Sequence, residues 1–126
     1  MPSLGRVLVV DDAPEVVDTL QDIVQALGYE ATAARSGEMA IAAMATREAH
    51  LVLLDLLMPG MSGLGALTYF RQHHPAVPVI ILTADVEHET ARLARAAGAF
   101  AVVTKPYSID PLGSLLTRAM AQAPRE

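Results

Sequence analysis

The sequence predicts an α/β protein in which helices cover both faces of a five-stranded parallel sheet, a doubly wound three-layer sandwich. Three observations support this fold class. Short apolar runs of strand length recur along the chain, segments with helical periodicity separate them, and the two kinds of segment alternate from beginning to end.

Four apolar runs have strand length and are rich in β-branched residues: 7–10, 51–54, 79–82 and 100–103. Runs that are almost continuously apolar, rather than alternating, are typical of strands covered on both faces. A fifth candidate, 29–34, is weaker because it includes Glu30 and Thr32. We expect this fifth strand at an edge of the sheet.

The segments between the strands have the periodicity of amphipathic helices. The clearest spans 13–27, with Pro14 in its first turn and Gly28 as its C-terminal stop. Its predicted inner face consists of Val16, Leu20, Ile23, Val24 and Leu27. The other expected helices are 39–45 after an N-cap at Ser36, 63–73 before Pro75, 86–97 ended by Gly98, and 109–120 capped by Ser108, where Pro111 and Gly113 weaken the start.

The resulting order is βαβαβαβαβα. Right-handed crossovers place helices on both faces of the sheet, and an edge position for the second strand favours the strand order 2-1-3-4-5. This is a flavodoxin-like (βα)5 arrangement. Ligands of such sheets bind beyond the carboxyl ends of the strands, near the point where the strand order reverses.

Composition excludes several classes of protein. A length of 126 residues predicts one domain, 1–126, and the absence of cysteine excludes disulfides, thiolate metal sites and a Cys nucleophile. The net charge of −5 and the lack of a basic run argue against direct nucleic-acid binding. Apolar stretches of about five residues are too short to cross a membrane, and no signal peptide is evident, so we expect a cytoplasmic protein.

Polar residues follow four of the predicted strands: Asp11 and Asp12, Asp55, Thr83, and Lys105, the single lysine among nine basic residues. Three carboxylates in one crevice repel each other unless a cation intervenes, and one lysine does not balance them. Mg²⁺ takes oxygen ligands and binds one or two carboxylates together with a phosphoryl group. The crevice is therefore suited to Mg²⁺ and phosphate.

Each of these residues also has a simpler interpretation. An Asp after a strand commonly caps the next helix, Thr83 could be a turn residue, and Lys105 could be a solvated surface charge. Their convergence at one sheet edge favours a functional site over these separate explanations.

The chain resembles the receiver domain of two-component response regulators. Four motifs in order carry this resemblance over essentially its whole length: Val9-Val10-Asp11-Asp12, the segment from Leu53 to Gly63 with Asp55 and Met58-Pro59-Gly60, Leu82-Thr83-Ala84, and Thr104-Lys105-Pro106-Tyr107. The resemblance implies a signalling phosphoacceptor, not an enzyme with a separate substrate.

The resemblance also implies a role for each matching residue. Asp55 would accept a phosphoryl group from a phosphohistidine of a sensor histidine kinase or histidine phosphotransfer protein. Asp12, Asp55, the Leu57 carbonyl and, through a metal-bound water, Asp11 would hold Mg²⁺. Lys105, the Thr83 hydroxyl and the Ala84 amide would contact the phosphoryl group. These roles amount to positioning and charge neutralisation.

Switching in this family uses an aromatic residue on the fifth strand, where this sequence has Val102. Phe100 lies two positions earlier and is expected on the same face by strand periodicity. Tyr107 replaces a common Phe. The output surface implied by the family comprises the fourth helix, fifth strand and last helix, and it carries Arg92, Arg95 and Arg118. The four histidines, His50, His73, His74 and His88, are interpreted as surface residues.

Three other functions are weighed against the receiver. A Mg²⁺-dependent phosphohydrolase usually has its acids two positions apart after the first strand, whereas Asp11 and Asp12 are adjacent. In a flavin protein, the same acids would repel the phosphate, and the Gly60, Gly63 and Gly65 cluster lacks the dinucleotide-binding spacing. An adaptor that has lost switching is the third alternative, which Val102 favours.

No output domain is expected within these residues. The chain is either a stand-alone receiver or the receiver of a longer protein, and the sequence leaves its kinase, its output partner and the formation of a homodimer open.

Overall fold

The computed structural model describes residues 5–56, 63–83, 88–104 and 109–121 of the chain. Five strands and five helices alternate in the described part, as the sequence predicts. The strands are β1 (Arg6–Val10), β2 (Glu30–Ala34), β3 (Leu51–Asp55), β4 (Val79–Thr83) and β5 (Ala101–Thr104). The helices are α1 (Pro14–Ala26), α2 (Gly37–Thr46), α3 (Gly63–His73), α4 (His88–Ala96) and α5 (Ile109–Ala121).

The sheet is parallel and has the order β2-β1-β3-β4-β5, which confirms the predicted doubly wound fold and the edge position of β2. β3 and β4, which lie in the interior of the sheet, are buried at every residue. β2 has exposed residues at Thr32 and Ala33, as its mixed composition predicts. The mixed composition of β2 thus agrees with its exposed edge position, and the apolar composition of β3 and β4 agrees with their burial.

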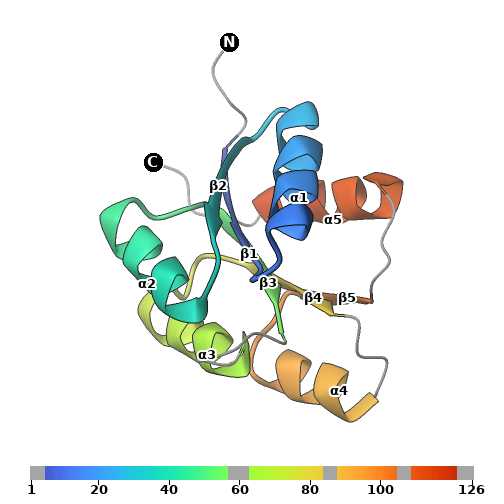
Figure 1. Ribbon diagram of the computed structural model, residues 1–126. Coiled ribbons are helices and arrows are strands. Elements are labelled where there is room, and N and C mark those ends of the chain that lie inside the picture. Colours follow the sequence, from blue (N-terminus) through green and yellow to red (C-terminus); the bar gives the residue numbers. More distant parts are fainter. Residues whose placement is uncertain (1–4, 57–62, 84–87, 105–108, 122–126) are drawn as a thin grey trace.

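Two separate core clusters lie on the two faces of the sheet. One contains buried side chains of α2, α3 and α4, and the other contains buried side chains of α1 and α5. Figure 1 shows the same division, with α1 and α5 together on one side and α2, α3 and α4 on the other. On the predicted inner face of α1, Leu20 and Val24 are buried, and Val16, Ile23 and Leu27 are partly buried and pack against the same core. Val17, which the prediction did not include, is also buried.

The predicted cap at Ser36 and the predicted glycine stops after α1 and α4 are confirmed. The Ser36 hydroxyl accepts a hydrogen bond from the Met39 amide at 3.0 Å and caps α2. Gly28 and Gly98, which follow α1 and α4, have φ values of 98° and 104°, a conformation that favours glycine. Two predicted features, the start of the fourth helix at Val86 and the Ser108 cap, lie outside the described residues.

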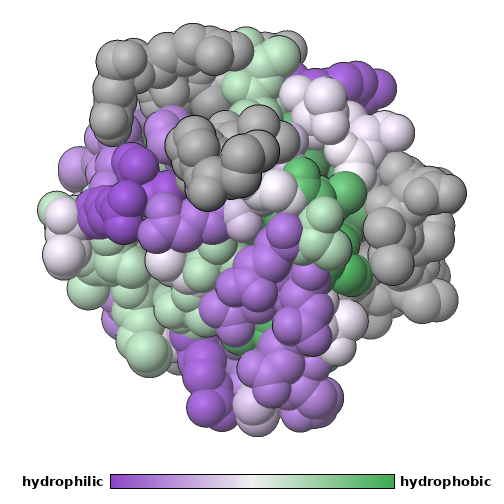
Figure 2. Space-filling view, turned by 90° about the horizontal axis from the view of Figure 1, so that it is seen from above, coloured by the Kyte–Doolittle hydropathy of each residue, from purple (hydrophilic) through white to green (hydrophobic). Residues whose placement is uncertain are grey.

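Hydrophobic residues make up 52% of the chain, and many of them lie inside. The face seen in Figure 2 carries hydrophilic side chains over much of its area, with smaller hydrophobic areas between them. Among the helices in the described part of the chain, none combines the length and the apolar character that a membrane span requires.

Candidate functional site

Strand register brings the predicted acidic residues to one edge of the sheet. Val10 of β1 is paired with Leu54 of β3, so the residues that follow them, Asp11 and Asp55, are neighbours across the two strands. Asp55 is in turn paired with Leu82 of β4. The parallel arrangement thus places side chains 44 positions apart in sequence next to each other.

The carboxylates of Asp11, Asp12 and Asp55 form one cluster. Each contributes an oxygen that lies within 4.8 Å of the others. Asp11 and Asp55 are only 2% and 6% exposed, whereas Asp12 is exposed. Two buried carboxylates and a third beside them repel one another, and a bound cation offsets this repulsion.

The main chain holds Asp11 in place. Its Oδ1 accepts a hydrogen bond from the Ala13 amide at 3.0 Å, and its own amide donates to the Ala34 carbonyl at 3.2 Å. The N-cap of α1 is Ala13, with no side-chain cap hydrogen bond. Helix capping by Asp11 or Asp12, the simpler interpretation of these residues, is therefore not what the structure shows.

Thr83 is the last residue of β4 and is 1% exposed. It is paired with Thr104 of β5, the residue that precedes Lys105. A buried hydroxyl thus ends the strand beside the one that carries Asp55. The other predicted site residues, Leu57, Ala84 and Lys105, lie outside the described residues, as does Tyr107.

The prediction that Phe100 and Val102 share a face is wrong. Val102 packs against the cluster formed with α2, α3 and α4, whereas Phe100 packs against the cluster formed with α1 and α5. Because β5 begins at Ala101, Phe100 precedes the strand, and the alternation of side chains does not extend to it. Phe100 therefore does not take the place of an aromatic residue at Val102.

The histidines are less uniformly on the surface than predicted. His50 is partly buried, and its Nδ1 accepts a hydrogen bond from the Arg6 amide at 2.9 Å. The His74 side chain is 14% exposed and forms a short contact with Glu48. Only His73 is exposed among the three whose side chains are described. Sequence periodicity missed these positions because they lie in or beside loops.

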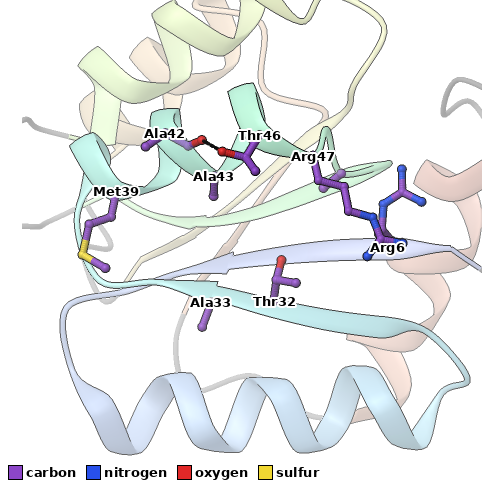
Figure 3. A pocket seen from close by; sticks show the side chains of 9 residues that line it. Arg6, Thr32, Ala33, Met39, Ala42, Ala43, Thr46 and Arg47 are labelled. Carbon is purple, nitrogen blue, oxygen red and sulfur yellow. Dashed lines mark hydrogen bonds between the residues drawn. The ribbon is translucent and has the colours of Figure 1, made fainter.

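A separate groove of about 440 Å³ lies between α2 and the strands β1 and β2 (Figure 3). Met39 lies at one end, Arg6 and Arg47 lie at the other, and small residues such as Ala43 line the space between them. Arg47 forms an ion pair with Glu30 at 3.1 Å, and Arg6 donates to the Glu48 carbonyl at 2.9 Å. The two arginines therefore already have protein partners, and the groove shows no comparable convergence of reactive groups.

The acidic cluster is thus the candidate site. Comparison with known proteins shows the family to which the chain belongs. The family model described as the response regulator receiver domain matches residues 7–117, almost the whole chain. The chain belongs to this family. The receiver domain recognised in the four sequence motifs is thereby confirmed.

Curated relatives of this receiver domain are longer proteins. It is 38% identical over 120 residues to the regulatory protein AtoC of Escherichia coli, covering 95% of this chain and 26% of AtoC. It is 37% identical to the DNA-binding transcriptional regulator NtrC of Salmonella typhimurium, covering 93% of this chain and 25% of NtrC. The chain therefore spans about a quarter of the length of these relatives.

A solved structure supports the same assignment at the level of the fold. The CheY-like receiver domain protein from Methanospirillum hungatei has a TM-score of 0.90 and 27% sequence identity. The match covers 95% of this chain and 96% of that one. The likeness thus extends over a whole receiver domain.

The groups that orient Asp11 leave no signal in the sequence. The Ala13 amide and the Ala34 carbonyl are main-chain atoms, and one of them comes from the neighbouring strand β2. No side-chain pattern could have identified them, because any residue except proline supplies an amide and every residue supplies a carbonyl.

Proposed function

We propose that this receiver domain accepts a phosphoryl group on Asp55 in a Mg²⁺-dependent reaction. The observation that carries the proposal is the cluster of Asp11, Asp12 and Asp55, with oxygens within 4.8 Å, at the carboxyl end of β1 and β3. The family match supports the proposal, since receiver domains act as phosphoacceptors in two-component signalling.

The donor set suits Mg²⁺. All three side chains offer hard carboxylate oxygens, and the exposure of Asp12 leaves one side of the cluster open to solvent and to a phosphoryl donor. Asp12, Asp55 and the Leu57 carbonyl would hold the ion, with Asp11 acting through a metal-bound water. When bound, the ion would neutralise the carboxylates and the incoming phosphoryl oxygens.

In the proposed reaction, an Asp55 carboxylate oxygen forms a bond to phosphorus while the P–N bond of a phosphohistidine breaks. The bonding pair stays on the imidazole nitrogen of the donor, and Asp55 becomes an aspartyl phosphate. Lys105, the Thr83 hydroxyl and the Ala84 amide would hold the phosphoryl oxygens. The burial of Thr83 fits this role, because the surrounding residues restrict a buried side chain at the carboxyl end of β4.

The donor would be a sensor histidine kinase or a histidine phosphotransfer protein. The added charge of about −1.5 to −2 would change the surface formed by α4, β5 and α5. Arg92, Arg95 and Arg118 are exposed on this surface. The response would pass through it to a protein target or to an output domain, as the length of the relatives suggests.

Intact mass after incubation with Mg²⁺ and acetyl phosphate tests the proposal. We expect wild type to gain one phosphoryl group only when Mg²⁺ is present, and Asp55→Asn to gain none, because an amide is not a nucleophile of this kind. Asp18→Asn, on the exposed face of α1, is the matched control and should react like wild type. No gain in wild type, with Mg²⁺ binding shown separately, would favour an adaptor without switching or a receiver that accepts phosphate only from its protein partner.

A further inference from the structure

Gly63 lies against the end of the strand that carries Asp55. It is the first residue of α3, it is buried, and its amide donates a hydrogen bond to the Leu56 carbonyl at 3.0 Å. The N-terminus of α3 is thereby attached to the main chain directly after Asp55.

The contact leaves no room for a side chain at position 63. A Cβ atom there would lie 2.4 Å from the Leu56 Cα, 2.6 Å from the Leu56 carbonyl oxygen and 2.7 Å from the Asp55 carbonyl oxygen. All three are main-chain atoms, which cannot rotate away as the end of a flexible side chain can. Separations of this size are far below ordinary van der Waals contact.

The requirement for glycine here is one of space, not of backbone conformation. Gly63 is not among the described glycines with positive φ, which are Gly5, Gly28 and Gly98. At Gly98, by contrast, the three atoms nearest to an added Cβ all belong to the flexible Arg71 side chain, the first at 3.0 Å. At Gly63, a side chain would instead push directly against the main chain of Asp55 and Leu56.

Neither of the two elements in contact can withdraw easily. Ala66, Leu67 and Phe70 anchor α3 in the core with no exposed surface. β3 is paired on both sides, with β1 and with β4, and the Leu56 amide donates to the Leu82 carbonyl at 3.3 Å. An extra methyl group between them must therefore shift Asp55 and Leu56 or tilt α3.

We propose that Gly63 is a positioning residue for the acidic site: its lack of a side chain lets α3 set the place of Asp55 relative to Asp11 and Asp12. This inference rests on the proposed function only in taking the cluster as a divalent-cation site. A displaced ligand weakens a metal site, and changes in residues that orient ligands typically reduce metal affinity about 10- to 100-fold.

The test compares Mn²⁺ affinity, measured by the electron paramagnetic resonance of the free ion, in wild type and Gly63→Ala. We expect at least a tenfold loss of affinity in the variant. Gly113→Ala is the control for a glycine replacement, because its Cβ would meet Leu27 at an ordinary 3.4 Å. Phe70→Leu is the control for a destabilised α3 that leaves the contact with Leu56 in place. Both controls should bind Mn²⁺ like wild type.

A measurement on wild type covers the case in which Gly63→Ala does not fold. If the Gly63 contact and cation binding stabilise one arrangement, the coupling is reciprocal. Saturating Mg²⁺ should then slow hydrogen exchange of the Gly63 amide more than that of the Arg71 amide at the other end of α3. Equal slowing at both amides, or none, would overturn the inference.

The outcomes separate this inference from the proposed function. If wild type binds Mn²⁺ and a folded Gly63→Ala binds it equally well, the positioning role is wrong and the cation site stands. If wild type binds no divalent cation, both are wrong. An equal loss of affinity in Gly63→Ala and Phe70→Leu would assign the effect to general destabilisation and would also overturn the positioning role.

Discussion

Asp11 and Asp12 are adjacent in sequence but lie in different environments. Asp11 is buried and accepts a hydrogen bond from Ala13, whereas Asp12 is exposed. A change at Asp11 would therefore disturb the main chain after β1 as well as the charge of the cluster. Asp12 is the position at which the electrostatics can be tested separately.

At the scale of single residues, we predict that Asp12→Asn is more stable than wild type in the presence of EDTA. Two unit charges about 5 Å apart repel by about 1 kcal/mol in water, and the substitution removes this repulsion. Thermal unfolding in EDTA should show a Tm higher by about 3–5 °C, while stabilisation by Mg²⁺ is reduced. Asp18→Asn, which is outside the cluster, should leave both quantities unchanged. A lower Tm for Asp12→Asn would contradict net repulsion in the cluster.

Single residues also show where sequence reasoning fails. Strand alternation predicts the wrong face for Phe100, because the strand begins only at Ala101. The sequence predicts surface positions for His50 and His74, yet both are partly buried and contact distant residues. Local periodicity cannot identify such contacts, since Arg6 and Glu48 are 44 and 26 positions away from their histidine partners.

At the scale of elements, α2 depends strongly on its N-cap. The helix has little amphipathic character, since apolar or small residues occur all round it, and Met39 is 54% exposed. The start of α2 therefore depends on the Ser36 cap. In α1, by contrast, the inner and outer faces differ clearly, and the helix forms without a side-chain cap.

We predict that Ser36→Ala lowers the free energy of unfolding by about 1 kcal/mol, because the Met39 amide loses the acceptor of its 3.0 Å hydrogen bond. Urea denaturation followed by circular dichroism measures the change. Thr46→Ala, at an exposed position in the last turn of α2, is the control and should change stability by less than about 0.5 kcal/mol. Equal losses in the two variants would show that the cap is not the cause.

The elements themselves were largely predictable. The apolar runs located β1, β3 and β4 to within one residue, and α3 begins and ends at the predicted residues, 63 and 73. The strands are covered on both faces, and α3 has one buried and one exposed face. In both cases the local sequence pattern matches the final environment. Helix and strand ends elsewhere shifted by one or two residues, which is expected where termini depend on hydrogen bonds that sequence does not show.

At the scale of the whole molecule, the proposed cation site links binding to folding. The cluster requires β1 and β3 to be paired, so at the proposed site a divalent cation would bind the folded chain far better than the unfolded one. Binding should therefore stabilise the entire cooperative unit and not only the loops near the site.

We predict that Mg²⁺ raises the Tm of wild type in a concentration-dependent way, with about 2.7 kcal/mol of added stability at 100 times the dissociation constant. Differential scanning calorimetry with increasing Mg²⁺ measures this effect. KCl at matched ionic strength is the control for charge screening, and Asp55→Asn should show a much smaller rise. A Tm that does not depend on Mg²⁺ in wild type would contradict cation binding at the cluster.

The sequence by itself determined the fold class, the strand order and the identity of the acidic residues. These depend on local composition, on the alternation of strands and helices, and on the rule that parallel strands present their carboxyl ends at one edge. Only the tertiary structure decided that Asp11 is held by Ala13 and Ala34, that Phe100 and Val102 pack on opposite faces, and that Gly63 touches the main chain at Asp55. The physical reason is that these features depend on contacts between segments far apart in sequence. Some are contacts between main-chain atoms and others are side-chain packing against distant helices, and no local pattern encodes either.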